Sequence, residues 1–318
     1  MSDVLVRAEG LRVEYPGRGG RVTALRDVDL DILQGETLGL VGESGCGKST
    51  FGRALLRAVE PAAGRVEFAG QDITRLRGRA LRRVRADLQM VFQDPFGSLN
   101  PRRRVADIVA EPLLRARGAS RAEAAQAVTE LLDLVGLGAE AGGRSPHEFS
   151  GGQRQRIGIA RALASRPQFV VADEAVSALD VSIQAQVLNL LSDLVRDRGL
   201  TMLFISHDLG VVRHIADRVA VMYLGEVVEV APRDAFFAAP AHPYGRALLA
   251  SVPAVRRERH EPQVLQGELP DPARPPEGCL FQTRCPAATD TCRTTRPALR
   301  EIGAGRSVRC HLPLVAVA

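Results

Sequence analysis

Lys48 is the only lysine among the 42 lysine and arginine residues of the chain, and it lies in the segment Gly42-Glu-Ser-Gly-Cys-Gly-Lys-Ser-Thr50. An ammonium group is a compact charge with rotatable donors, so it fits among phosphate groups in a tight loop better than a planar guanidinium does. The segment has the pattern G-x-x-x-x-G-K-[ST] of a phosphate-binding P-loop. Residues 37–41 predict a buried strand before it, and residues 49–58 predict a helix after it. A glycine-rich turn with a chance lysine is the weaker alternative, because this order directs backbone N–H groups at phosphate oxygens.

The overall composition indicates a globular protein without a strong nucleic-acid signal. The chain has 318 residues, a formal charge of +5, and 45% hydrophobic and 25% charged residues. Its arginines form only short clusters, so we interpret the charge as a solvated surface and expect no nucleic-acid partner. No apolar run reaches the roughly 18 residues needed to span a bilayer, and residues 1–7 do not have the layout of a secretory signal. We therefore expect a cytosolic chain whose membrane-spanning partners are other polypeptides.

Hydrophobic periodicity predicts an α/β fold. Apolar and polar residues alternate over residues 5–31, which predicts antiparallel strands. A helical stretch is predicted over about 101–163, where Ser120 and Glu123 have capping-box spacing. Ser182 is expected to cap a later helix. Further strands are predicted at residues 64–68, 89–92, 169–172 and 201–205. Strands that alternate with helices favour a parallel sheet covered on both faces.

The composition and the hydrophobic pattern of the sequence change near residue 250. From about Pro253 the chain is rich in Pro and Arg, shows little periodicity and holds four of the five cysteines. We therefore expect one domain over residues 1–250, with a helical subdomain at about 97–160, and a C-terminal extension over residues 251–318.

Asp173 and Glu174 follow a predicted buried strand. Adjacent residues at a strand end point in different directions, so the two carboxylates can have separate roles. One can hold magnesium through its water shell beside the Ser49 hydroxyl, and the other can orient and polarise an attacking water. Two acids at a strand end are a common loop feature, and it is the P-loop upstream that favours the functional interpretation.

A second anion-binding helix start is predicted within residues 149–156, Phe-Ser-Gly-Gly-Gln-Arg-Gln-Arg. A serine and two glycines before a helix leave backbone N–H groups for an anion. The phosphates of one nucleotide do not need two such sites in one chain, so we expect the second site to close over a nucleotide held by another subunit. An ordinary helix start capped by Ser150 is the alternative.

Together with Ser177-Ala-Leu-Asp180 and His207, these motifs resemble, in order and spacing, an ABC transporter nucleotide-binding subunit over roughly residues 4–250. The resemblance implies an α/β P-loop NTPase fold of the ABC ATPase type, with a mixed sheet, an antiparallel β subdomain, a helical subdomain and a small Cys-containing C-terminal extension. It implies ATP and Mg²⁺ as ligands. The implied ATP-binding residues are Gly42, Glu43, Ser44, Gly45, Cys46, Gly47, Lys48, Ser49, Thr50, Asp173 and Asp180, with Ser150, Gly151, Gly152 and Gln153 gripping the ATP of the second subunit.

The same resemblance assigns catalytic roles. Glu174 is the implied catalytic base, and His207 is the implied contact to the γ-phosphate. Gln93 is implied to sense magnesium and the attacking water and to meet the membrane subunit. Ser49, Gln93 and Asp173 are the implied magnesium residues.

Two further positions, Tyr15 and Ala175, concern the adenine and the loop after the two acids. Tyr15 fits the aromatic that stacks on adenine in this family, and a plain strand-end residue is the alternative. Ala175 departs from the family, which usually has proline after the Asp-Glu pair. Because both carboxylates are present, we expect altered loop stiffness rather than lost chemistry.

The C-terminal residues narrow the resemblance. Residues 242–249, 251–253, 266–270, 275–279 and 284–286 are similar to the extension of oligopeptide and dipeptide importer ATPases, and the P-loop and residues 151–156 resemble their F-type subunit. This implies a head-to-tail ATPase dimer with a D-type subunit or a second copy of this chain. It also implies two transmembrane permease subunits, an external solute-binding protein and a peripheral place on the cytoplasmic face of the cell membrane.

The four cysteines after residue 250 are Cys279, Cys285, Cys292 and Cys310, with spacings C-x5-C, C-x6-C and C-x17-C. These spacings match no common zinc or ferredoxin pattern, and stable disulfides are not expected in a cytosolic chain. The spacing leaves metal ligation and four unrelated thiols open. The resemblance implies a four-iron, four-sulfur cluster on these cysteines, as in some family members, with zinc as the fallback.

We expect the chain to bind and hydrolyse ATP and so to energise import of di- or oligopeptides. The segment 93–102 would carry the movement to the membrane subunit. The alternative is a soluble ABC-type ATPase acting on nucleic acid or the ribosome, but such proteins usually have two cassettes or a long coiled-coil insertion. A metal-sensing regulator built on the cysteines would leave the ATPase motifs unexplained.

Overall fold

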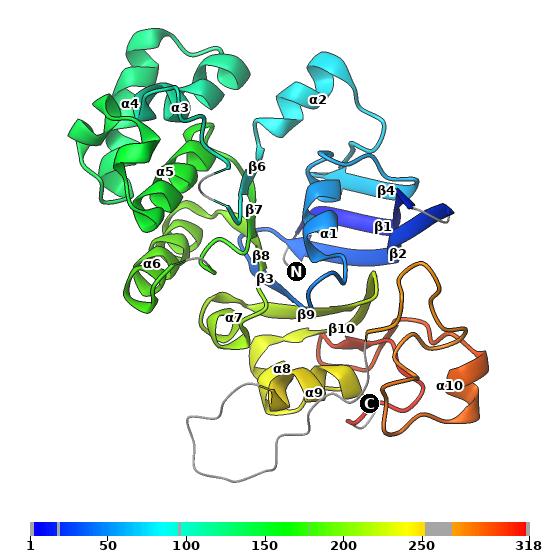
Figure 1. The fold of residues 1–318 in the computed structure, drawn as a ribbon. Helices are drawn as coiled ribbons and strands as arrows, with labels where there is room; N and C mark the ends of the chain where they lie inside the picture. Colours follow the sequence, from blue (N-terminus) through cyan, green and yellow to red (C-terminus); the bar gives the residue numbers. More distant parts are fainter. Residues whose placement is uncertain (1–2, 18–19, 95–96, 178, 252–268, 316–318) are drawn as a thin grey trace. The chain divides into compact units, whose positions relative to one another are not determined.

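The structure of the chain is a computed structural model that describes residues 3–17, 20–94, 97–177, 179–251 and 269–315 (Figure 1). Its internal contacts divide the chain into two compact units. The helical unit comprises residues 1–5, 32–36 and 68–205, and the P-loop unit comprises residues 6–31, 37–67 and 206–318. The C-terminal extension therefore belongs to the same compact unit as the P-loop.

The P-loop unit contains two sets of paired strands. The first has the order β2-β1-β4, and the short connection between β1 and β2 is one that only antiparallel neighbours allow. The second has the order β11-β12-β10-β9-β3. In it β3 pairs parallel with β9, whereas β9 and β12 both pair antiparallel with β10, so the expected mixed sheet is confirmed. The strand bounds are β1 Val4–Gly17, β2 Gly20–Leu33, β3 Thr37–Val41, β4 Ala63–Phe68, β9 Arg218–Tyr223, β10 Glu226–Pro232, β11 Arg300–Glu301 and β12 Ser307–Val308.

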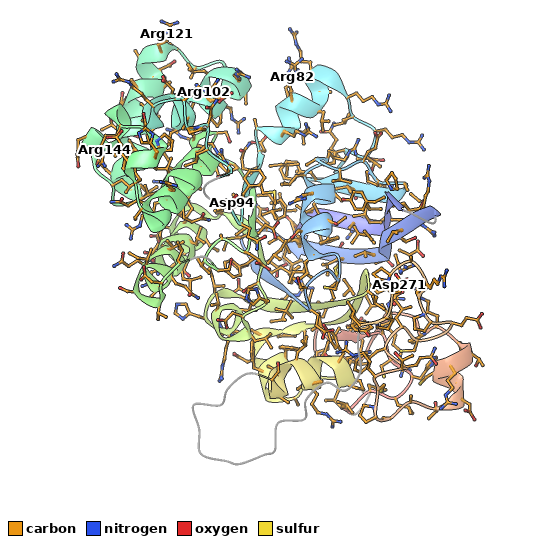
Figure 2. All side chains as sticks on the ribbon, in the orientation of Figure 1. Arg82, Asp94, Arg102, Arg121, Arg144 and Asp271 are labelled. Atoms are coloured by element: carbon orange, nitrogen blue, oxygen red, sulfur yellow. The ribbon has the colours of Figure 1, made fainter. Side chains whose placement is uncertain are left out.

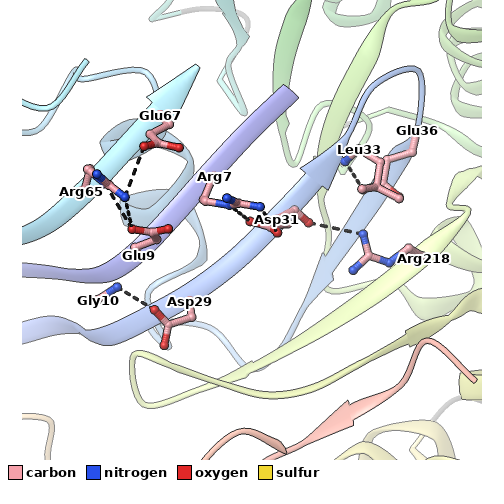
Figure 3. Close-up of polar contacts among 10 residues, drawn as sticks. All are labelled: Arg7, Glu9, Gly10, Asp29, Asp31, Leu33, Glu36, Arg65, Glu67 and Arg218. Carbon is pink, nitrogen blue, oxygen red and sulfur yellow. Dashed lines mark hydrogen bonds and ion pairs between the residues drawn. The ribbon is translucent and has the colours of Figure 1, made fainter. Parts of the chain in front are cut away.

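Charged side chains pair across the strands of the first set (Figure 3). Arg7 Nε donates to Asp31 Oδ1 over 2.8 Å, which links β1 to β2, and Arg65 Nη2 lies 2.6 Å from Glu9 Oε2, which links β4 to β1. Arg218 at the start of β9 donates to the backbone oxygen of Asp31. These pairs are open to solvent and therefore screened, so they fix the strand register more than they add stability.

The P-loop unit contains an aromatic cluster made by Tyr223 of β9, Tyr244 of α9 and Phe281 of the C-terminal extension. All three rings are buried, with centroids 4.7 Å apart for the tyrosine pair and 5.3 Å and 5.4 Å from Phe281 to the two tyrosines. Such edge-to-face packing of large rings is a strong source of core stability. The helix bounds are α1 Lys48–Leu55, α7 Leu209–Ile215, α8 Arg233–Ala238, α9 Pro243–Ala250 and α10 Asp290–Thr294.

The helical unit is built on the strand order β8-β7-β6, and both pairs are parallel. Every residue of β7 and β8 is buried, as expected for parallel strands covered on both faces. The strands are β5 Gln71–Asp72, β6 Leu88–Val91, β7 Phe169–Asp173 and β8 Thr201–Ile205. The helices are α2 Gly78–Arg85, α3 Val105–Pro112, η1 Leu113–Arg117, α4 Arg121–Leu134, η2 Ala139–Gly143, η3 Pro146–Glu148, α5 Gly151–Ala164 and α6 Val181–Arg198.

The helix starts confirm one capping prediction and correct another. Ser120 and Glu123 form the expected capping box at α4. The prediction that Ser182 caps α6 is wrong, because Asp180 occupies the N-cap position and its Oδ1 accepts the N–H of Ile183 at 3.0 Å. Serine and aspartate are comparable caps, so the residue type could not decide between the two positions.

Surface arginines of the helical unit are dispersed. Arg82, Arg102, Arg121 and Arg144 are exposed and project at separate places (Figure 2). The helices in the described ranges include none with both the length and the hydrophobicity of a membrane span.

Candidate functional site

The P-loop joins β3 to α1 through backbone that only glycine can adopt. Gly42 has a φ of +153°, and a Cβ atom there would lie 2.2 Å from the backbone oxygen of Met222. Gly47 has a φ of +107°, and its Cβ would lie 2.7 Å from the backbone oxygen of Ala24. The loop therefore packs directly against the backbone of the neighbouring strands, which explains two of the glycines in the motif.

The side chain of Lys48 turns back toward the start of the loop. Its side chain is buried, and Nζ donates to the backbone oxygens of Gly42 at 2.7 Å and Glu43 at 2.9 Å. Cys46 is also buried, and its Sγ lies 3.9 Å from Nζ. The ammonium is thus held by the first two residues of the loop, and burial keeps its charge poorly screened.

The start of α1 differs from the other helix starts that carry predicted motifs. Among the described residues, no side chain caps α1 at Gly47, and its first turn has no acidic residue. The first N–H groups of a helix need partners from outside the helix, and the helix dipole makes this end attractive to anions. The loop and the start of α1 can therefore receive phosphate oxygens.

Tyr15 and His207 belong to the same unit as the P-loop. Tyr15 lies near the end of β1 and is 38% exposed. His207 is exposed in the turn between β8 and α7, directly before Asp208, which caps α7. Adenine stacking by Tyr15 and phosphate contact by His207 remain predictions.

The helical unit brings Gln93 and Glu174 together. Gln93 Nε2 donates to Glu174 Oε2 over 2.6 Å. Asp173 is the buried last residue of β7, and Glu174 directly after it has a φ of +46°. The backbone oxygen of Glu174 accepts two hydrogen bonds from Ser177, one from its N–H and one from its hydroxyl. These bonds close the turn that holds this conformation. A left-handed backbone at a non-glycine residue is strained and often marks a functional position.

The predicted signature residues form the start of α5 in the same unit. Ser150 Oγ accepts the N–H of Gln153 at 3.3 Å, and Gln153 Oε1 accepts the N–H of Ser150 at 3.0 Å. This reciprocal pair is a capping box, so Ser150 does cap the helix. Both residues are exposed, and contact with a second subunit remains a prediction.

All four cysteines of the C-terminal extension line one small cavity, together with His242 and Phe281. Burial raises the pKa of Cys279 to about 11, and the neighbouring thiols add to that shift. Three of the sulfurs accept a backbone N–H from the residue two positions later, in Cys279, Cys285 and Cys310. Within the described part of the chain, no three or more Cys, His, Asp or Glu side chains are arranged to hold a metal ion.

Two residues of the C-terminal part contact the P-loop, and the sequence did not predict either contact. Tyr244 Oη accepts the N–H of Glu43 at 2.8 Å. Arg284 donates to both carboxylate oxygens of Glu43, which raises the pKa of Arg284. Both residues lie in segments that resemble the importer extension, but no local pattern could link them to a loop 201 and 241 residues earlier.

Comparison with known proteins gives the following similarities. Residues 25–177 match the ABC transporter family model, and residues 228–292 match the model of the oligopeptide/dipeptide transporter C-terminal region, which begins upstream of the expected boundary near residue 250. The chain is 51% identical to a probable peptide ABC transporter ATP-binding protein of Sinorhizobium fredii, covering 100% of this chain and 92% of the relative. It is 53% identical to the oligopeptide transport ATP-binding protein AppF of Bacillus subtilis, covering 92% and 90%. The dimeric ATP-binding cassette MJ0796 bound to ADP and Pi matches with a TM-score of 0.67 and 31% identity, over 72% of this chain and 99% of that one.

Proposed function

The chain belongs to the ATP-binding subunits of oligopeptide and dipeptide ABC transporters, and we propose that it is an F-type subunit that hydrolyses ATP to energise peptide import. The structural observation that carries the ATPase assignment is the P-loop itself. Its glycines permit the close packing of the loop, Lys48 lies inside it, and α1 begins without a side-chain cap. Full-length identity to proteins named for peptide transport favours an importer over an ATPase that acts on nucleic acid.

The residues divide the chemistry between binding and hydrolysis. Loop N–H groups and Lys48 hold the phosphates, and Tyr15 stacks on adenine. Glu174 accepts a proton from the attacking water, Gln93 fixes the Glu174 carboxylate through the 2.6 Å contact, and His207 contacts the γ-phosphate. The role of Gln93 as an orienting donor is supported by its bond to Glu174.

The donor set fits a magnesium ion, because hydroxyl, amide and carboxylate oxygens are the ligands that Mg²⁺ takes together with water and phosphate. Ser49, Gln93 and Asp173 would hold it. When bound, magnesium neutralises charge on the transferred phosphoryl group.

We propose a head-to-tail dimer in which Ser150 to Gln153 of one subunit contact ATP held by the other. The exposed start of α5 and the likeness to a dimeric cassette support this arrangement. The second subunit is D-type, and the assembly includes two transmembrane permeases and an external solute-binding protein. The chain then sits peripherally on the cytoplasmic face of the membrane.

We also propose that Cys279, Cys285, Cys292 and Cys310 hold a four-iron, four-sulfur cluster, with zinc as the alternative occupant. Four cysteine thiolates are a suitable donor set for either. Their convergence on one cavity and the backbone N–H groups directed at three of the sulfurs support the proposal. Because the described side chains are not gathered as ligands, binding requires them to close around the metal.

The function is tested on the full-length protein assembled with permease subunits in membrane vesicles. Hydrolysis of ATP should rise with permease and peptide-loaded binding protein, and DNA or RNA should have no effect. Lys48 is the only lysine of this chain, so on the isolated chain an amine-reactive reagent has Lys48 as its only side-chain amine target, and Mg-ATP should protect Lys48. Stimulation by nucleic acid with no response to permease would contradict the importer assignment.

A further inference from the structure

Arg284 of the C-terminal extension and Glu43 of the P-loop form a two-pronged ion pair inside the P-loop unit. Arg284 Nη1 lies 2.6 Å from Glu43 Oε2, and Nη2 lies 2.9 Å from Oε1. The Arg284 side chain is only 4% exposed, and that of Glu43 is 28% exposed. Paired charge-assisted bonds of this kind fix geometry as well as add energy, and burial protects them from screening by salt.

Glu43 is held by its backbone as well as by its carboxylate. Its N–H donates to Tyr244 Oη, and its carbonyl oxygen accepts the Lys48 ammonium at 2.9 Å. The residue that begins the loop after Gly42 is therefore fixed from three directions. Two of these contacts come from the chain beyond residue 240, and the third connects Glu43 to Lys48.

The guanidinium is itself positioned by the aromatic cluster. Its Cζ lies 5.9 Å from the centre of the Tyr223 ring, and Phe281, three residues earlier, packs against Tyr223 and Tyr244. Arg284 therefore approaches the loop from a rigid base, and the same base holds the Tyr244 hydroxyl.

A carboxylate in a loop that receives phosphates poses an electrostatic problem. Because Glu43 belongs to the loop that binds the phosphates, its carboxylate, if unpaired, would be close enough to repel the triphosphate. The paired guanidinium removes this repulsion and fixes the loop carbonyl that holds Lys48.

We propose that Arg284 is a positioning residue of the ATP site, which neutralises Glu43 and holds the first turn of the P-loop in the shape that accepts phosphate. This inference rests on the proposed ATPase function and adds a residue from the C-terminal extension to the binding machinery. Arg284 acts through Glu43 and is not assigned a contact to the reacting atoms.

The test measures binding of a fluorescent ATP analogue with Mg²⁺, and KM and kcat for ATP, in full-length variants. Arg284→Ala should raise Kd and KM by about tenfold or more, as expected when one member of a buried charge pair is lost. The value of kcat should change by less than about threefold, because Arg284 supports binding rather than the chemical step. Glu43→Gln combined with Arg284→Ala removes both charges and should bring Kd back toward the wild-type value.

Arg306→Ala is the matched control. Arg306 belongs to the same extension, is 13% exposed and pairs with the buried Glu229, and none of its described hydrogen bonds or ion pairs is to a P-loop residue. Its loss should lower the thermal midpoint and leave KM for ATP unchanged. Arg284→Lys keeps the charge without the planar guanidinium, so it should give a KM between those of the wild type and Arg284→Ala. If Arg284→Ala does not fold, the Arg284→Lys variant and the double variant are used for the test instead.

Equal Kd and KM in all folded variants would overturn the role of Arg284. A wild-type protein that binds no ATP would instead overturn the proposed function, so the two failures are distinguishable.

Discussion

Gln93 donates a hydrogen bond of 2.6 Å to the carboxylate of Glu174, and the backbone of Glu174 is left-handed, with a φ of +46°. Such a conformation costs about 1–2 kcal/mol for a non-glycine residue. The cost is offset by the Ser177 bonds that close the turn. Gln93 thus orients the carboxylate, while Ser177 holds the backbone that carries it, and a general base needs such positioning.

Replacing Glu174 by Gln should abolish most turnover while ATP binding persists. The amide keeps the shape of the side chain but cannot accept a proton, so kcat should fall by about 100-fold or more. ATP-bound dimers should accumulate, which gel filtration with Mg-ATP would detect. Glu130→Gln is the control, because Glu130 is an exposed residue of α4 bonded only to Gln126 within the hydrogen bonds described for it. Near-normal hydrolysis by Glu174→Gln would remove the base assignment.

Asp180 caps α6, and this role can be separated by mutation from any role at the second subunit. Asp180→Ala removes the acceptor for the Ile183 N–H and should lower the free energy of unfolding by about 1 kcal/mol. Asp180→Asn keeps an acceptor and should leave stability close to wild type. Urea unfolding of the two variants decides the point, since equal destabilisation would show that the side-chain oxygen is not the cap. Loss of ATPase in the stable Asn variant would then report on the nucleotide site.

His242 should make the protein less stable in acid. The ring is fully buried, which lowers its pKa to about 3. Its Nδ1 accepts the N–H of Tyr244 at 3.0 Å, and the other nitrogen donates to the backbone oxygen of Arg309. A second proton on the ring would have to bind at Nδ1, where it would point at the Tyr244 N–H, itself a donor.

The unfolded chain binds a proton at His242 below a pKa of about 6.5, whereas the folded chain does not until about pH 3. Stability is therefore present above about pH 6.5 and is lost as the pH falls toward 3, by about 2 kcal/mol at pH 5. His242→Asn retains a cap for Tyr244, so denaturation at pH 7.5 and pH 5 should show a smaller loss in that variant. Glu229 accepts the N–H of His242, and its raised pKa cancels in this comparison. The same pH response in both proteins would contradict the role of His242.

Protein isolated without oxygen should contain iron and absorb broadly in the visible range if the cysteine proposal is correct. Cys285→Ser should lower the iron content and the absorbance. Cys46→Ser is the control thiol, because Cys46 lies in the P-loop and not in the cysteine cavity. Zinc in stoichiometric amount would identify the alternative occupant. Colourless, metal-free, active protein would refute the cysteine proposal and leave the ATPase assignment unchanged.

Short-range patterns carried most of what could be predicted. The P-loop, the capping boxes at α4 and α5, and the buried strands β7 and β8 each depend on residues a few positions apart. The pairing of Arg284 with Glu43 depends on tertiary packing across 241 residues and gives no local signal in a chain so rich in arginine. The start of α6 was misassigned because two acceptable caps lie two residues apart.

The antiparallel pairing of β12 with β10, at Glu229 with Val308 and Val230 with Ser307, has a practical consequence for anyone who shortens the protein. A cassette truncated after residue 250 would leave the normally buried β10 as a bare outer strand with unpaired N–H and C=O groups. Strands of this kind recruit one another and promote aggregation. By pairing with β10, the two residues of β12 thus cover an edge that would otherwise be open to other strands.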